Sequence, residues 1–328
     1  MKILIIINLF FLLSCTTTKK EYEFDKNLTG YNYPFKVQVF KFKSQKQTLA
    51  MAYGDLGNKK SQKIALLLHG KNFSGFYWDK IANDLVKMNY RVIIPDQIGF
   101  GKSSKPENYD FSFSQLALNT KKLLDHLKIK KYQIVGHSMG GMLAVHLAYL
   151  DETNVNSITL VNPIGLEDYS KYVLYKDPDF FYQNEVNKTV QQFRSYQQKN
   201  YYDGKWSNQY EQLLAPFKGW RSGPDWSLIA WNNALTYGPI FSEEIVSKLS
   251  RIKIPTTLIL GTRDRTGPGR GWKKLGVTRK LGLYQKLGKD IMSTNPKFIK
   301  LIELDGLGHM PQFEDYSRFS DVFYPLFK

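Results

Sequence analysis

The chain has 328 residues, of which 42% are hydrophobic and 15% aromatic, so it can bury a large core and is neither disordered nor fibrous. Its formal net charge of +17 would attract anionic partners or anionic lipid. The Lys and Arg residues are scattered rather than gathered in a dense block, which indicates a solvated basic surface and argues against a nucleic-acid partner.

The first residues have the pattern of a targeting segment. An apolar run over residues 3–13, interrupted by Asn8, is too short to cross a bilayer and is typical of a secretory signal. It leads into the sequence LLSC, whose last residue, Cys15, is the only cysteine in the chain. This sequence resembles the lipobox of bacterial lipoproteins, in which the cysteine carries a lipid. A plain signal peptide and an incidental cysteine are the alternatives.

We therefore expect residues 1–14 to be a lipoprotein signal peptide and residues 15–33, which are polar and lack a sustained period, to be a tether. The lipid on Cys15 would attach the protein to a membrane. Thr16 rather than an aspartate follows the cysteine, which in the resembling lipoproteins favours the outer membrane. The expected location is the bacterial cell envelope, with the protein facing the periplasm.

From residue 34 onward, strand and helix patterns alternate. The first two strand segments alternate apolar and polar residues, whereas the later ones are continuous apolar runs, typical of parallel strands buried on both faces. The expected strands cover residues 37–42, 48–53, 64–68, 90–95, 132–136, 157–162, 256–260 and 298–304. The expected helices cover residues 78–88, 114–127, 139–150, 185–198, 242–249 and 319–326.

The alternation stops after Pro163. Residues 165–252 are rich in aromatic and amide side chains and lack buried-strand runs, which predicts an inserted helical cap. Residues 34–164 and 253–328 would then form an α/β core with a mostly parallel sheet flanked by helices. The aromatic residues of the cap would either line an apolar pocket or form the cap's own core. They include Tyr201, Tyr202, Trp206, Trp220, Trp226 and Trp231.

The sequence GHSMG at residues 136–140 fits the pattern G-x-S-x-G and lies between a predicted strand and a predicted helix. The two glycines allow a strained turn that would lift the Ser138 hydroxyl above the strand ends. A tight strand-to-helix turn without chemistry is the alternative. With this motif the chain resembles the α/β-hydrolase family, in which the serine is the nucleophile. The resemblance covers the chain from about residue 34 to the end, outside the cap.

A serine hydroxyl needs a neighbouring base, and the base needs an acid that fixes its tautomer. His309 follows the last predicted strand, where the resembling family carries its base. Asp264 follows the strand before it, where the family carries its acid, and the chain order of serine, aspartate and histidine is also the family's. Asp168 or Glu167, one strand earlier, is the alternative acid. A surface ion pair with its flanking arginines is the alternative role for Asp264.

The tetrahedral intermediate of acyl transfer needs donors for its oxyanion, and in the resembling family these are backbone amides. By motif position they belong to Met139, next to the nucleophile, and to Lys71, which follows His69 and Gly70. Asn72 is the alternative to Lys71. The Lys71 side chain would then either have no role or reach an acidic group of the substrate.

Several other polar residues are expected to be structural. Asp96 opens the loop DQIGFGKS, where an aspartate commonly forms a turn by accepting hydrogen bonds from backbone amides. His69 is expected to pack or to hydrogen-bond beneath the oxyanion loop. His126 and His146 lie within predicted helices and are expected to have a surface or packing role, and His137 is too close to Ser138 to be its base.

The resemblance implies a serine hydrolase that cleaves a carboxylic ester, or a related acyl bond, of a small-molecule substrate through an acyl-enzyme on Ser138. Serine at this position argues against haloalkane dehalogenases and epoxide hydrolases, which carry aspartate there. The alternatives are an amidase or proline-type aminopeptidase, a carbon–carbon bond hydrolase and, outside enzymes, an envelope ligand-binding protein. No metal-ligand cluster or nucleotide-binding motif is visible in the sequence, so no cofactor is expected.

Overall fold

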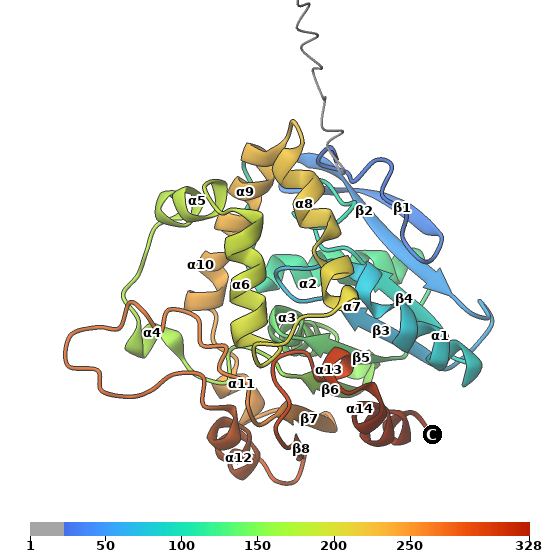
Figure 1. Cartoon of the computed structure of the whole chain (residues 1–328). Coiled ribbons are helices and arrows are strands. Elements are labelled where there is room, and N and C mark those ends of the chain that lie inside the picture. Colours follow the sequence, from blue (N-terminus) through green and yellow to red (C-terminus); the bar gives the residue numbers. More distant parts are fainter. Residues whose placement is uncertain (1–22) are drawn as a thin grey trace, which may run out of the picture.

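A computed structural model describes residues 23–328, which form a single eight-stranded sheet with helices packed on both faces (Figure 1). The strands are β1 (Val37–Ser44), β2 (Gln47–Leu56), β3 (Ile64–Leu68), β4 (Arg91–Pro95), β5 (Tyr132–His137), β6 (Val155–Val161), β7 (Thr256–Gly261) and β8 (Ile299–Leu304). Their order across the sheet is β1-β2-β4-β3-β5-β6-β7-β8. β2 pairs antiparallel with β1 and β4, and every other pair is parallel. The predicted α/β fold with a mostly parallel sheet is therefore confirmed.

The parallel strands bury both faces because successive side chains point to opposite sides of the sheet. In β3, Leu66 and Leu68 belong to a core with residues of α2 and α3, whereas Ala65 and Leu67 belong to a second core with α1 and α14. Within residues 23–328, no helix is both long and apolar enough to cross a membrane. The helices of this part are η1 (Gly75–Trp78), α1 (Asp79–Lys87), α2 (Phe113–His126), α3 (Met139–Leu150), η2 (Glu152–Asn154), α12 (Tyr284–Thr294), α13 (Pro311–Glu314), α14 (Tyr316–Phe323) and η3 (Tyr324–Phe327).

A group of short helices lies between β6 and β7 in the chain, and we call residues 165–252 the cap. Most of these helices stand above the central sheet in the view of Figure 1. Their polar N-terminal residues explain several of their starting points; for example, Asp177 caps α5 and Ser207 caps α7. The cap helices are α4 (Tyr169–Tyr172), α5 (Pro178–Val186), α6 (Val190–Asn200), α7 (Asn208–Leu213), α8 (Ala215–Ser222), α9 (Trp226–Leu235), α10 (Tyr237–Ser242) and α11 (Val246–Leu249).

The expected single helix over residues 185–198 is wrong, because the chain forms two helices there. α5 ends at Val186 and α6 begins at Val190. The Thr189 hydroxyl accepts a hydrogen bond from the Gln192 amide at 3.1 Å, and the Gln192 side chain accepts one from the Thr189 amide at 2.8 Å. This reciprocal cap satisfies two backbone donors and starts a new helix.

The expected helix over residues 242–249 is also wrong, for a different reason. The structure contains α10 and α11 there, with a break between them. At the break the Glu243 carboxylate accepts a hydrogen bond from the Phe113 amide at the start of α2, at 3.1 Å. A tertiary contact between cap and core therefore ends α10.

The tether expected to extend to residue 33 is wrong for residues 24–33, which pack against the folded domain. Leu28 is fully buried, and the Tyr33 hydroxyl donates a hydrogen bond to Asp96 at 2.7 Å. The apolar and aromatic residues of this segment lie among polar and turn-forming residues and do not sustain one period. The sequence pattern therefore did not reveal that they are buried. The earlier part of the tether and the signal peptide, including Cys15, lie outside the described residues.

The closest approach between α3 and the sheet depends on glycine. A Cβ atom at Gly140 would lie 2.3 Å from the Leu68 carbonyl oxygen and 2.7 Å from that of His69. Backbone atoms cannot move aside as a flexible side chain can, so only glycine fits there.

We predict that Gly140→Ala lowers the free energy of unfolding by about 1–3 kcal/mol or more, because the added methyl group overpacks the junction of α3 and β3. Gly238→Ala in α10 is the control, since a Cβ there meets no atom within 4 Å. Denaturant unfolding of both variants measures the difference. Equal stabilities of the two variants would contradict the close packing.

Candidate active site

Ser138 occupies the turn between β5 and α3 in a strained backbone conformation. Its φ is 55° and its ψ is −121°, a region that residues other than glycine seldom adopt and that costs about 1–3 kcal/mol. Gly136 makes the turn possible, because a Cβ atom there would lie 2.4 Å from the Gly140 carbonyl oxygen. Because α3 begins at Met139, the Ser138 hydroxyl lies at a helix N-terminus, which favours negative charge.

Three side chains that are far apart in the sequence form one hydrogen-bonded chain. Nε2 of His309 lies 2.9 Å from Oγ of Ser138, and Nδ1 of His309 lies 2.7 Å from Oδ2 of Asp264. His309 and Asp264 are at most 1% exposed, and Ser138 is 7% exposed. Because the carboxylate accepts the Nδ1 proton, Nε2 of a neutral His309 is free to accept the serine proton.

The Asp264 carboxylate is held as an anion. Besides His309, Oδ2 accepts a hydrogen bond from Nδ2 of Asn162 at 2.8 Å, and Oδ1 accepts one from the Thr266 amide at 2.7 Å. Burial would raise the pKa of Asp264, but the electrostatic interaction with His309 and the hydrogen bonds from His309 and Thr266 outweigh it and hold this pKa below its usual value. Sequence reasoning missed Asn162; the available signal was an amide side chain at the end of the predicted strand 157–162, directly before Pro163.

The structure also separates the other candidate acids from His309. Asp168 caps α4 by accepting a hydrogen bond from the Ser170 amide at 3.2 Å. Glu167 accepts hydrogen bonds from Arg279 at 3.2 Å and from the Gly282 amide at 2.7 Å. The arginines that flank Asp264 do not contact its carboxylate, since one pairs with a glutamate of α13 and the other donates to backbone oxygens.

A second hydrogen-bonded chain supports the histidine from behind. The Gly70 amide donates to the Tyr77 hydroxyl at 2.9 Å, and this hydroxyl lies 3.0 Å from Nδ1 of His137. Nε2 of His137 lies 2.9 Å from the His309 carbonyl oxygen. Burial lowers the pKa of His137 to about 3, so His137 is neutral and donates its Nε2 proton to that carbonyl. His137 thus positions the backbone of His309. Sequence reasoning missed Tyr77, whose hydroxyl group links His137 to the Gly70 amide.

The amides of Met139 and Lys71 are placed beside the serine. A Cβ atom at Gly70 would lie 3.1 Å from Cβ of Ser138, so the loop that carries Lys71 touches the nucleophile turn. Neither amide donates a hydrogen bond to an acceptor within residues 23–328. Buried amides normally have partners, and two unpaired amides next to a serine can bind a developing oxyanion.

Above Ser138 lies a cavity of about 760 Å³ between core and cap, which we call the Ser138 cavity. Its lining includes Lys71, Tyr201 and Tyr237, together with residues of α6 and of the loop after β7. The volume suits a small organic substrate. A smaller, apolar cavity of about 40 Å³ adjoins it and shares Lys71 with it.

The cap aromatics have different roles. Tyr201 lines the Ser138 cavity, whereas Trp220 and Trp226 line the smaller cavity. Tyr202 stacks on Tyr210 at a ring distance of 3.6 Å and belongs to a packed core. Both interpretations of these residues therefore hold, each for a part of the set. Trp206 and Trp231, the remaining two of these six cap aromatics, donate hydrogen bonds through their indole nitrogens, to Glu211 and to the Glu107 carbonyl oxygen respectively.

The polar residues expected to be structural make structural contacts. The Asp96 carboxylate accepts hydrogen bonds from the amides of Gly75 at 2.6 Å and Lys102 at 2.8 Å. Nε2 of His69 accepts one from the Gln97 amide at 3.0 Å. Within residues 23–328 no group of three or more His, Cys, Asp or Glu residues is arranged to hold a metal ion.

The fold and this arrangement agree with a comparison against protein families. Residues 66–315 match the alpha/beta hydrolase fold family. The chain belongs to this family and is a hydrolase of the alpha/beta hydrolase superfamily.

Individual relatives extend the comparison. The crystal structure of a probable hydrolytic enzyme from Pseudomonas aeruginosa is 38% identical, with a TM-score of 0.89, and the match covers 93% of this chain and 98% of that one. A probable lysophospholipase of Arabidopsis thaliana, BODYGUARD 2, is 32% identical over 32% of this chain and only 24% of its own length. A proline iminopeptidase of Lactobacillus acidophilus is 24% identical over 66% of this chain and 79% of its own length.

We predict that Tyr77→Phe lowers the free energy of unfolding by about 1–3 kcal/mol, because it leaves the buried Gly70 amide without an acceptor. Tyr175→Phe is the control: Tyr175 is 74% exposed, and its loss should change stability by less than about 0.5 kcal/mol. Urea unfolding compares the two variants. If both are as stable as the unaltered protein, the hydrogen-bonded chain behind His309 contributes nothing.

Proposed function

We propose that the protein is a serine hydrolase that cleaves a carboxylic ester, or a related acyl bond, through an acyl-enzyme on Ser138. The observation that carries this proposal is the hydrogen-bonded chain from Ser138 through His309 to Asp264, buried at the floor of a cavity large enough for a substrate. A ligand-binding protein would need the cavity but would have no use for this chain.

The reaction follows from the geometry. Nε2 of His309 takes the Ser138 proton as Oγ attacks the substrate carbonyl, and the resulting imidazolium is stabilised by the anionic Asp264. The amides of Met139 and Lys71 hold the oxyanion of the tetrahedral intermediate. His309 then gives its proton to the leaving group, and a water molecule releases the acid product by the same steps.

The charges around the cavity favour an acyl ester over a peptide with a free amino terminus. An aminopeptidase needs an available carboxylate to bind the substrate ammonium group, and within residues 23–328 no Asp or Glu lines the Ser138 cavity. Glu185 lies behind it but already accepts hydrogen bonds from Lys188, Asn233 and Tyr237. Although the chain is similar to a proline iminopeptidase, the lining of its Ser138 cavity within residues 23–328 therefore offers no carboxylate for a substrate ammonium group.

A fluorophosphonate probe tests the nucleophile directly, because it reacts covalently with an activated serine. We expect the unaltered protein to be labelled and Ser138→Ala to be unlabelled. Ser195→Ala, an exposed serine of α6, is the matched control and should be labelled fully. Labelling is measured by intact-protein mass spectrometry, and a folded protein that is never labelled at Ser138 would refute the proposal.

The acid can be tested by comparing two aspartates. Asp264→Asn should lower kcat for a p-nitrophenyl ester on the order of 10⁴-fold, because the amide favours the wrong tautomer of His309. Asp168→Asn, the same change at the alternative acid, should lower it less than about twofold, since asparagine can still cap the short helix α4. Steady-state kinetics decide, and a larger loss in the second variant would reverse the assignment.

We further propose that Cys15 carries a lipid and holds the protein at the bacterial cell envelope, at the outer membrane. The lipobox-like sequence before Cys15 supports this, and the net charge of +17 would favour contact with anionic head groups. The lipid would provide the membrane anchor, since residues 3–13 are too short to cross a bilayer.

We predict that Cys15→Ser shifts the protein from the membrane fraction to the soluble fraction. Ser14→Ala, which keeps a small residue before the cysteine, should leave it in the membrane fraction. Cell fractionation with immunoblotting measures both. Unchanged membrane association of the first variant would exclude an anchor at this cysteine.

A further inference from the structure

Three basic residues line the cavity that Ser138 also lines. Lys71, Lys188 and Arg270 line the Ser138 cavity, and within residues 23–328 no carboxylate does. One carboxylate lies nearby, that of Glu185, which is 2% exposed and is placed 2.6 Å from Nζ of Lys188. The surroundings of the cavity therefore carry more positive than negative charge.

Lys71 is the most unusual of the three, because its ammonium group is buried without a carboxylate in contact. Nζ donates to the backbone oxygen of Asn233 at 2.6 Å and to its side-chain oxygen, and lies 3.8 Å from the centre of the Tyr237 ring. These partners are neutral. Burial lowers the pKa of Lys71 to about 7, although the charge of Glu185 opposes this shift. A bound anion would supply the countercharge that this site lacks.

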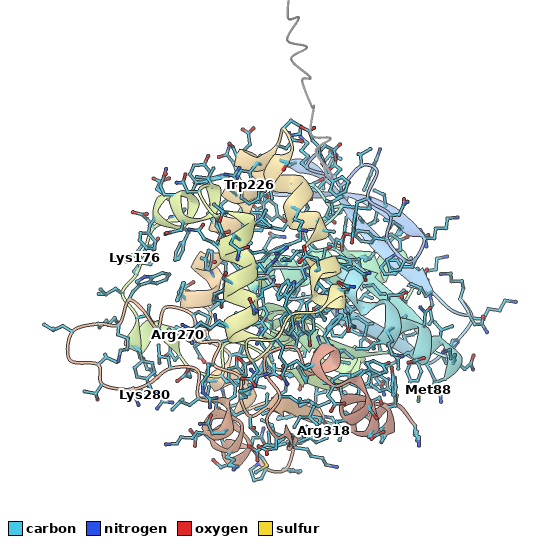
Figure 2. All side chains as sticks on the ribbon, viewed as in Figure 1. Met88, Lys176, Trp226, Arg270, Lys280 and Arg318 are labelled. Carbon is cyan, nitrogen blue, oxygen red and sulfur yellow. The ribbon has the colours of Figure 1, made fainter. Side chains whose placement is uncertain are left out.

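Arg270 lies on the loop after β7, beside the C-terminal end of α6 (Figure 2). Its guanidinium group donates to the Arg265 carbonyl oxygen at 2.6 Å and to the Asn200 side-chain oxygen at 2.7 Å, both of which are neutral. Two of its five N–H donors are used in these contacts, so others remain for a ligand. A guanidinium group with free donors is well suited to bind a carboxylate or phosphate through two parallel hydrogen bonds.

We propose that the Ser138 cavity selects substrates that carry an anionic group, a carboxylate or a phosphate, in addition to the acyl bond that is cleaved. Arg270 and the Lys71 ammonium group bind this anion. The inference rests on the proposed function, because it assigns a substrate class to the same site. Lys71 then acts twice: its amide faces the oxyanion, and its side chain binds a second anionic group of the same molecule.

Equilibrium binding to the Ser138→Ala protein tests the anion site without turnover. Mono-4-nitrophenyl adipate is compared with neutral 4-nitrophenyl hexanoate, and 1-hexanoylglycerol 3-phosphate with neutral 1-hexanoylglycerol. We expect about tenfold tighter binding of the anionic member in at least one pair, weakening as salt is added. A preference within the adipate pair would show that the site binds a carboxylate, and a preference within the glycerol pair would show that it binds a phosphate. Calorimetry that finds equal affinities within both pairs would overturn the inference.

The contribution of Arg270 is tested by adding Arg270→Gln to the same protein. The preference for the anionic member should fall at least threefold. Lys280→Gln is the matched control: it removes one positive charge from the same loop, and Lys280 is exposed and lies outside the cavity (Figure 2). An equal loss in both variants would mean that only general surface charge attracts the ligand, which would also overturn the inference.

Hydrolysis of the four esters by the protein with Ser138 intact is scored separately. If none is cleaved in a Ser138-dependent way, the proposed hydrolase activity fails, while the binding comparison still decides whether the anion site exists. If the neutral esters are cleaved and no anion preference appears, the hydrolase proposal stands and the anion site is excluded.

Discussion

The strained turn at Ser138 is the constraint from which the rest of the site follows. A φ of 55° at a serine persists only if surrounding structure compensates for its cost. Here the compensation comes from close packing of backbone against backbone, where glycines at positions 136 and 140 let β5, α3 and the end of β3 approach each other. The same close packing brings the loop of Lys71 beside Ser138, so the serine and the proposed oxyanion donors are positioned together.

The loops after successive strands complete this arrangement from one edge of the sheet. Asn162 follows β6, Asp264 follows β7 and His309 follows β8, and each hydrogen-bonds to the next group in the chain that ends at Ser138. A parallel sheet makes this possible because the carboxyl ends of its strands lie at a common edge. The neutral His137, which is itself hydrogen-bonded to Tyr77, holds the backbone carbonyl group of His309 in place.

The cap holds a charged side chain of the core beside the Ser138 cavity. Lys71 belongs to the core loop, yet its ammonium group is held by Asn233 and Tyr237 of the cap. Contacts between cap and core thus reach the residue whose amide is proposed to bind the oxyanion. The buried Glu185 forms an ion pair with Lys188, while Lys71 and Arg270, which also line the cavity, have no carboxylate of residues 23–328 in contact.

The sequence by itself determined the α/β fold, because buried parallel strands produce apolar runs that need no tertiary knowledge to recognise. It also determined the motif around Ser138, since only glycines fit its turn. The predicted strand ends further placed Asp264 and His309 in the loops after the last two strands. The break between α5 and α6 has a local cause, the capping pair Thr189 and Gln192. The tertiary structure alone decided the contact of Glu243 at the end of α10, the burial of residues 24–33 and the partners of Asp264. These depend on contacts between residues that are distant in the chain, such as that of Glu243 with α2, and such contacts leave no periodic signal in a sequence.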